Sequence, residues 1–326
     1  MDSALQEGLV LRIDAKFCQV EIGGQRHSLP LSGKLFERKS HEKRPLSVGD
    51  RVLVRIDAQG GAIDELLPRM SQLTRRAASE GEERAQVIAA NITLVLIVAS
   101  IAEPPFQPEL VDGLLAAARR ENLNAVIVLT KLDRDKKGAV AHWQNLYQSI
   151  GVTVLVTSTS PELHTDDAFA QLAKLLHENR SVMCGLSGAG KSTLLNLVMP
   201  GLELRVGSLN HIRQGRHTTT HTELIPLPFG GHVLDTPGVR SFHMFHIGVQ
   251  ETQFLFVEIA ALLPQCGYRN CLHLGEPDCA VRVALAEKTI AETRYASYTA
   301  MLNWAQAAAK HVDGDDDRSS RRRRPR

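Results

Sequence analysis

The chain has 326 residues, of which 43% are hydrophobic and 23% are charged, and its formal net charge is only +2. This length predicts two or three domains, with enough apolar side chains for packed cores. The longest apolar run, 94–99, is far too short to span a bilayer, which excludes a membrane-spanning chain and favours a cytoplasmic protein.

The first part of the chain predicts an all-β domain. A sequence of about five short strands in about 65 residues predicts a small barrel, of OB or SH3-like type, and such barrels often bind RNA. The loop 37–44 adds five basic side chains, one of them histidine. Few aromatic residues are present for base stacking, which favours contact with the RNA backbone. The expected strands are 8–13, 17–22, 25–29 and 51–56.

An α/β domain is predicted to follow a charged linker with a helical start at 69–83. A strand is expected at 92–100, and the apolar run 125–129 predicts another. Amphipathic helices are predicted for 108–121 and 167–177, each with one apolar face to cover a sheet.

The tetrapeptide Thr130-Lys131-Leu132-Asp133 follows the second of these strands. It fits N/T-K-x-D, the motif with which GTPases read guanine. The aspartate accepts two hydrogen bonds from guanine, whereas adenine would leave the carboxylate unpaired. Thr130 stands where asparagine is commoner, which weakens the expected guanine selectivity. Ser158, after the strand run 154–156, is expected to lie in a loop that offers backbone N–H to the base oxygen.

A phosphate-binding loop is the strongest signal in the chain. Residues 185–192 fit G-x-x-x-x-G-K-S/T, the P-loop, with a strand run before it and a helical pattern after it. Lys191 is expected on the β- and γ-phosphates, where it also serves catalysis, and Ser192 on Mg²⁺. The predicted GTP-binding residues are Thr130, Lys131, Leu132, Asp133, Ser158, Gly185, Leu186, Ser187, Gly188, Ala189, Gly190, Lys191, Ser192, Thr193 and Gly238.

The turn 235–238, Asp-Thr-Pro-Gly, is typical of a switch that senses the γ-phosphate. Asp235 is the expected Mg²⁺-side carboxylate, and Gly238 would offer its N–H to the γ-phosphate. The loop 209–222 is the expected first switch. One of its three adjacent threonines, 218–220, would bind Mg²⁺, and Thr219 is the candidate.

Hydrolysis needs a group that orients the attacking water. Many GTPases place a glutamine just after the switch turn, but this chain has Val239 there. His217, in the first switch, is the internal candidate for that catalytic role, since an imidazole can polarise water near neutral pH. RNA contact or packing within the loop is the alternative role for His217.

The order of these motifs is rotated. In ordinary GTPases the P-loop comes first, then the switch turn and then the base motif. Here 130–133 and Ser158 precede the P-loop, and 235–238 comes last. This is a circular permutation, which a parallel sheet can survive because domain termini often lie close together.

Four residues near the C-terminus predict a zinc site. Cys266, Cys271, His273 and Cys279 have the spacing C-x4-C-x-H-x5-C. Three thiolates and one imidazole suit a tetrahedral structural Zn²⁺. A cluster of buried thiols is the alternative, and disulfides are disfavoured in the reducing compartment that nucleotide chemistry implies.

The chain resembles the RsgA (YjeQ) family of circularly permuted bacterial GTPases. The permuted motif order and the Cys/His spacing carry the resemblance, which covers most of the chain. It departs from the family pattern at Thr130 and at 91–93, where an acidic residue is often found. Further matching segments are 75–76, 86–91, 215–220, 276–277, Arg294-Tyr295 and Tyr298.

This resemblance implies an OB-type, RNA-binding β-barrel at 1–70 and a circularly permuted α/β P-loop GTPase domain at 71–245. A helical zinc-binding domain at 246–312 would follow, and then a disordered charged tail at 313–326 that either stays solvated or contacts RNA phosphates. It also implies a monomeric GTPase that binds GTP and GDP, with Mg²⁺ and one zinc. Such an enzyme is stimulated by the small ribosomal subunit and its 16S rRNA, and it acts late in the assembly of that subunit.

Two other classes of protein remain open from the residues alone. A P-loop ATPase or kinase would fit the phosphate loop, although Asp133 disfavours adenine. An RNA-binding scaffold with a regulatory nucleotide site and little hydrolysis would fit Val239.

Overall fold

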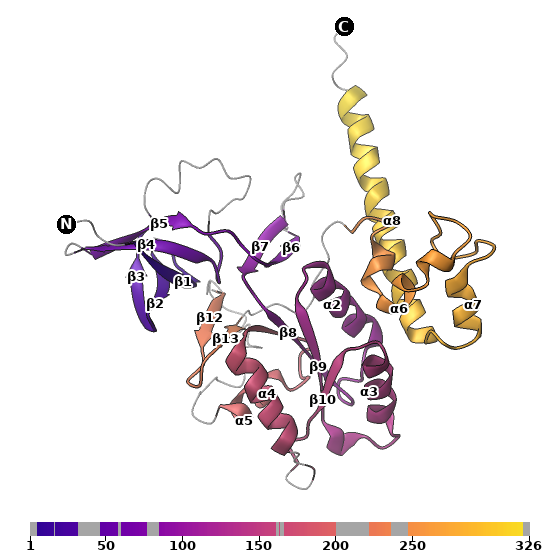
Figure 1. The fold of residues 1–326 in the computed structure, drawn as a ribbon, viewed down its shortest axis with the longest axis horizontal. Helices are drawn as coiled ribbons and strands as arrows, with labels where there is room; N and C mark the ends of the chain where they lie inside the picture. The colour runs from indigo at the N-terminus through magenta and orange to yellow at the C-terminus, as the bar shows by residue number, and fades with distance from the viewer. Residues whose placement is uncertain are drawn as a thin grey trace, which may run out of the picture.

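The computed structural model describes residues 5–15, 17–31, 46–57, 60–76, 85–160, 163, 166–199, 222–235 and 247–321. These residues form an N-terminal barrel, a central α/β layer structure and a helical C-terminal region (Figure 1). The central part lies between the other two. The barrel joins its sheet, and the C-terminal region packs against α2.

The N-terminal strands close into a barrel. Antiparallel pairing joins β1 to β2, β2 to β3, β1 to β4 and β4 to β5. A parallel bridge from Leu31 to Ile63 closes the ring between the β3 end and β5. This order is that of an OB barrel, and the predicted fold is confirmed. The strands are β1 Leu5–Ile13, β2 Cys18–Ile22, β3 Gln25–Leu29, β4 Arg51–Asp57 and β5 Gly60–Leu66.

The central sheet has the order β10-β9-β8-β11-β13-β12. All neighbours pair in parallel except β12, which runs antiparallel to β13 at the edge. A parallel sheet needs helices on both faces, because each strand is buried on both sides. The strands are β8 Leu94–Ser100, β9 Asn124–Thr130, β10 Thr153–Val156, β11 Arg180–Cys184, β12 Glu223–Pro226 and β13 His232–Asp235.

Strand β8 shows how the sheet divides two cores. Every residue of β8 is buried, and its side chains alternate between the two faces. Val95, Ile97 and Ala99 pack on one face with α2 (Pro108–Arg120) and α3 (Ala139–Ser149). The other face packs on α4 (Asp166–Glu178) and α5 (Lys191–Val198). The predicted strand 92–100 and helices 108–121 and 167–177 are therefore found within one or two residues of their expected bounds.

The predicted helical start in the linker 69–83 is wrong. Gln72–Arg76 forms β6, which pairs antiparallel with β7, Ala85–Ala90. Leu73 of β6 is fully buried and belongs to the same core as Val95 and Ile97 of β8. Charge and small residues set the local propensity of the linker, but the partner strand β7 decides its conformation.

The barrel and the central sheet are continuous. Strand β1 pairs with β12 at Arg12 and Glu223, so the barrel strands extend the sheet at its edge. Glu223 also forms an ion pair with Arg26 at 3.1 Å. These contacts fix the barrel to the strand that follows the expected first switch.

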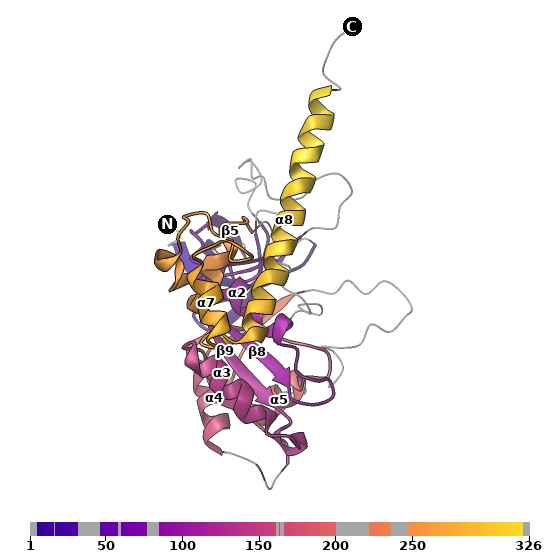
Figure 2. The same cartoon turned by 90° about the vertical axis from the view of Figure 1, so that its right-hand side faces the viewer.

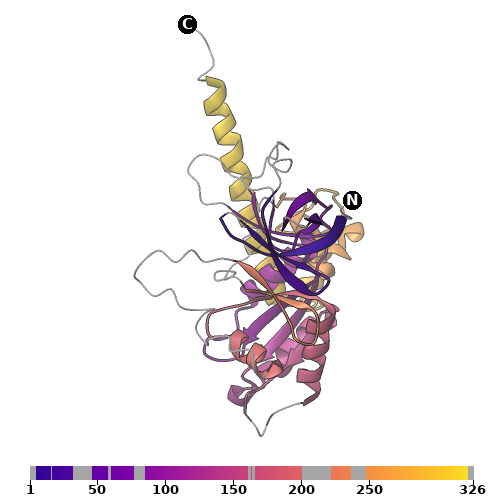
Figure 3. The same cartoon turned by 90° about the vertical axis from the view of Figure 1, so that its left-hand side faces the viewer.

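The C-terminal region is helical and ends in one long helix, α8, which projects away from the body (Figures 2 and 3). Its backbone continues to Arg321, so most of the segment expected as a disordered tail, 313–326, is helical in the structure. Neither α8 nor any other helix in the described part of the chain has the length and apolar composition needed to cross a membrane. The elements are η3 Thr252–Leu255, α6 Val257–Ala260, η4 Leu263–Gln265, α7 Ala280–Ala286 and α8 Glu292–Arg321.

A buried charge network joins the C-terminal region to α2. Arg294 of α8 donates to Asp112 of α2 at 2.7 Å and to both carboxylate oxygens of Glu258. The side chains of Arg294 and Asp112 are 4% and 0% exposed. Tyr147 of α3 donates to the same Asp112 oxygen at 2.9 Å, and the Arg294 guanidinium lies over the Phe256 ring. Because both charges are shielded from water, only the attraction and hydrogen bonds of their partners offset the cost of desolvation.

Replacing Arg294 with methionine should destabilise the protein by about 3–5 kcal/mol, because Asp112 would stay buried without its cation. Urea unfolding of both proteins measures the difference. The exposed Arg269→Met substitution in the same region is the control and should change stability by less than about 0.5 kcal/mol.

The Arg294→Met penalty should also grow with pH. Burial raises the pKa of Asp112, and the attraction of Arg294 opposes that rise. Without Arg294 the pKa rises further, so the folded variant binds a proton more readily than the unfolded chain and loses stability as pH increases. An equal penalty at about pH 5 and about pH 8 would contradict this account of the network.

Candidate nucleotide site and metal centre

The predicted P-loop connects β11 to α5, as the motif requires. Gly185 has φ +139°, and a Cβ there would lie 2.0 Å from the Val98 carbonyl oxygen of β8. Gly190 precedes α5 with φ 97°. The backbone can therefore pass this close to β8 only with glycine at 185.

Lys191 begins α5, and its Nζ folds back over the loop. It donates to the carbonyl oxygens of Gly185 at 2.9 Å and Leu186 at 2.7 Å. Ser192 follows in the same first turn and is buried. The Lys191 ammonium group thus lies over the loop, where it would contact the phosphate oxygens of a bound nucleotide.

The base motif lies directly against the P-loop. Thr130 ends β9, and its buried hydroxyl donates to the Ala189 carbonyl oxygen at 2.7 Å. The Ser158 hydroxyl, after β10, donates to Asp133 Oδ1 at 2.7 Å. The structure therefore brings together Thr130, Asp133, Ser158 and the loop 185–192, which are remote in the sequence. The register of the parallel strands does this, since their carboxyl ends meet at one edge of the sheet.

Glu103 and Arg134, which the sequence does not single out, lie next to the base motif. Lys131 Nζ donates to the Glu103 carbonyl oxygen, and Arg134 pairs with the Glu103 carboxylate. Pro104, the next residue, approaches the P-loop at Gly188. The loop 101–107 thus spans from the base motif to the P-loop. Its Pro104-Pro105 pair predicts only the end of a strand, so no local signal reveals this position.

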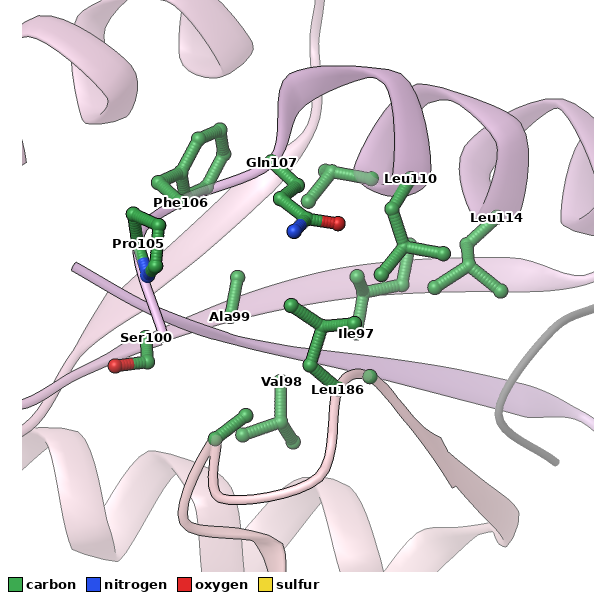
Figure 4. A pocket seen from close by; sticks show the side chains of 13 residues that line it. Ile97, Val98, Ala99, Ser100, Pro105, Phe106, Gln107, Leu110, Leu114 and Leu186 are labelled. Carbon is green, nitrogen blue, oxygen red and sulfur yellow. The ribbon is translucent and has the colours of Figure 1, made fainter. Parts of the chain in front are cut away.

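A narrow apolar crevice lies beside the P-loop (Figure 4). It is bounded by the end of β8, the start of α2 and the loop residue Leu186. Phe106, Gln107 and Leu110 line its α2 side. One face of α2 therefore borders the P-loop, while Asp112 of the same helix is paired with the C-terminal region.

Some predicted site residues lie outside the described residues: His217, Thr219 and Gly238. Asp235 is the last residue of β13, which pairs in parallel with β11, the strand that leads into the P-loop. Thr193 follows Ser192 in α5.

The Cys/His residues form a compact cluster. One ligand atom from each of Cys266, Cys271, His273 and Cys279 lies within 4.8 Å of the others. His273 Nδ1 lies 3.7 Å from Cys266 Sγ and 3.4 Å from Cys279 Sγ. A tetrahedral zinc ion with ordinary bond lengths places such nitrogen and sulfur atoms about 3.5 Å apart. The cluster could therefore hold one zinc ion with no open position.

Polar contacts fix the loop that carries the cluster. Glu276 accepts hydrogen bonds from the backbone N–H of Leu272, Leu274 and Gly275. Burial alone would raise the Glu276 pKa, but these donors stabilise the carboxylate and lower the pKa to about 2. The Tyr295 hydroxyl donates to the His273 carbonyl oxygen at 2.6 Å, which holds His273 in a left-handed conformation, φ 61°. A folded loop thus presents the ligands.

The strand order, the P-loop and the adjoining base motif define a circularly permuted P-loop GTPase fold, flanked by an OB barrel and a helical region with a Cys₃His cluster. The model of the RsgA GTPase family matches residues 66–245. The chain therefore belongs to the RsgA GTPase family.

Relatives and solved structures agree with this assignment. The chain is 36% identical over 267 residues to the small ribosomal subunit biogenesis GTPase RsgA of Chlorobaculum parvum, covering 79% of this chain and 85% of that one. It is 33% identical to the protein of the same name from Alkaliphilus metalliredigens, covering 91% and 97%. The crystal structure of YjeQ from Thermotoga maritima is similar with a TM-score of 0.76 and 29% identity, covering 93% of this chain and 99% of that one. YloQ, a circularly permuted GTPase, has a TM-score of 0.74 and 26% identity, covering 94% and 96%.

Gly185→Ala should weaken GDP binding by at least about 100-fold, equivalent to about 3 kcal/mol, because the added Cβ would push the P-loop off β8. Titration with a fluorescent GDP analogue measures this. Gly113→Ala, in α2, is the matched control, since its Cβ meets no atom within 4 Å. It should leave binding intact and add about 0.5–1 kcal/mol of stability. Equal binding by both variants would contradict the close approach at Gly185.

Proposed function

We propose that the chain binds GTP with Mg²⁺, hydrolyses it to GDP and phosphate, and acts on the maturing small ribosomal subunit. The observation that carries the nucleotide part is the Thr130–Ala189 hydrogen bond, which joins a guanine-reading motif to a phosphate-binding loop. The family assignment and the names of the relatives support the ribosomal part.

Guanine would be read at the ends of β9 and β10. The Asp133 carboxylate, already oriented by Ser158, would accept from guanine N1–H and the exocyclic amine. The Thr130 hydroxyl is committed to Ala189, so it would set the distance between base site and P-loop rather than contact the base. The loop 185–190, with Lys191 and Thr193, would hold the phosphates.

The ligands proposed for Mg²⁺ are Ser192, Asp235 and Thr219. Hydroxyl and carboxylate oxygens are the hard donors that this ion prefers. When bound, Mg²⁺ neutralises charge that develops on the phosphates. Val239 cannot orient water, and we assign that role to His217. Slow basal turnover is expected, because the first switch must be positioned before His217 can act.

The cluster of Cys266, Cys271, His273 and Cys279 would hold one structural zinc. The donor set and the separations of the ligand atoms support zinc over a catalytic metal, since all four positions would be filled by protein. The domains then comprise a barrel at 1–70, a GTPase domain at 71–245 and a zinc domain at 246–312. The barrel and the zinc domain would contact 16S rRNA, and the protein would act as a monomer in the cytoplasm.

Asp133→Asn should lower GTP affinity about 100-fold and favour xanthosine triphosphate. The amide would donate where the carboxylate accepts, which suits the C2 carbonyl of xanthine. Competition binding with GTP, ATP and xanthosine triphosphate measures the change. Asp167→Asn, an exposed residue of α4, is the isosteric control and should bind like the wild type. Stronger ATP than GTP binding by the wild-type chain would instead support the ATPase reading.

Small ribosomal subunits should raise GTP turnover by 10-fold or more, about 1.4 kcal/mol of barrier, by ordering the catalytic groups. Single- and multiple-turnover rates with and without subunits measure the effect, and large subunits serve as the control. His217→Ala should abolish the stimulation while leaving GTP affinity unchanged. An absence of stimulation in the wild type would favour the RNA-binding scaffold, and full stimulation of His217→Ala would remove His217 from the reaction.

A further inference from the structure

The metal ligand His273 has a buried partner from a different element. Its Nε2 lies 3.0 Å from Oε1 of Gln253, in the short helix η3. His273 is fully buried and Gln253 is 5% exposed. No water can replace this contact, so each group depends on the other for its hydrogen bond.

The direction of this bond follows from its surroundings. Gln253 Nε2 donates to Gln250 Oε1 at 3.2 Å, which leaves Oε1 to face His273 as an acceptor. With Gln253 Oε1 as the acceptor, His273 carries its proton on Nε2 and donates a hydrogen bond to Gln253. Nδ1 is then unprotonated, and it is the atom that faces the sulfurs of Cys266 and Cys279. The glutamine thus selects the tautomer that can bind a metal.

The helix η3 is also held on the GTPase domain. Arg119 of α2 donates to the Phe254 carbonyl oxygen at 2.9 Å, and Arg120 of α2 pairs with Glu251 at 3.2 Å. Gln253 lies between these two contact points in the sequence. The helix that borders the P-loop crevice is therefore joined, through η3 and Gln253, to a ligand of the metal cluster.

We propose that Gln253 is the positioning residue of the metal centre: it orients His273 for zinc and couples metal retention to the seating of η3 on α2. This rests on the zinc site of the proposed function. The inference differs from the ligand assignment, because Gln253 contributes no ligand atom.

Zinc retention in the full-length chain tests the proposal. Zinc-loaded wild type, Gln253→Leu and Gln253→Glu are titrated with a chromogenic chelator. Gln253→Leu leaves a shorter apolar side chain and removes the acceptor, so zinc affinity should fall about 10–100-fold. Gln253→Glu keeps an oxygen acceptor for His273 and should retain zinc within a few-fold of the wild type. Gln171→Leu, at an exposed position of α4 away from the Cys/His cluster, is the matched control and should retain zinc like the wild type.

Hydrogen exchange of the backbone amides at 251–255 tests the coupling. Removing zinc from the wild type should speed this exchange several-fold, because η3 would lose its contact with the ordered His273. In zinc-loaded Gln253→Leu the exchange should already be fast. Nitrogen-15 spectra of the imidazoles should show His273 protonated on Nε2 in the loaded wild type.

Three results would overturn the proposal. These are zinc affinity of Gln253→Leu equal to that of the wild type, His273 protonated on Nδ1, and exchange at η3 that ignores metal removal. If Gln253→Leu does not fold, a fall in zinc affinity of the folded Gln253→Glu variant of about 10-fold or more would likewise reject it. A wild-type chain that binds no zinc would instead refute the zinc site of the proposed function.

Discussion

The hydrogen bond from Thr130 to Ala189 depends on a constraint that organises the whole central domain. Strands β9, β8 and β11 run parallel and in register, so their carboxyl ends meet at one edge. The base motif and the P-loop lie at that edge because each follows one of these strands. A rotated order of the motifs along the chain changes the connections but leaves this edge intact, which is why a permuted sequence can still build one nucleotide site.

Helix α2 connects the nucleotide side of the central domain to the C-terminal region. Its start borders the crevice beside Leu186, while Asp112 on the same helix meets Arg294 of α8 in a nearly water-free contact. Such a pair contributes little net stability, since desolvation offsets most of the attraction. It fixes the position of the C-terminal region instead, because a displaced Arg294 would leave a buried carboxylate without a partner. The cluster of Cys266, Cys271, His273 and Cys279 is thereby held at a defined place relative to the P-loop.

Elements with a strong local signal are predictable here. Strand β8 is a continuous apolar run, and α2 combines an apolar stripe with Pro108 in its first turn. The segment 69–83 is not predictable, since the pairing of β6 with β7 depends on residues beyond it. The long extension of α8 is missed for a different reason. Its acidic run followed by arginines is typical of solvated ends, and Gly314 is a residue type that often ends a helix, yet the backbone of α8 continues through it.

The sequence by itself determined the chemistry of the chain, because the P-loop, the guanine motif and the Cys₃His spacing each need particular residue types at short fixed distances. It also determined the rotated order of the motifs. Only the tertiary structure decided which distant residues complete these sites: Glu103 beside Lys131, Asp112 with Arg294, and Gln253 behind His273. These pairs are 28, 182 and 20 residues apart, and no local pattern encodes them. They arise from packing, which must give every buried polar group a partner once the elements have come together.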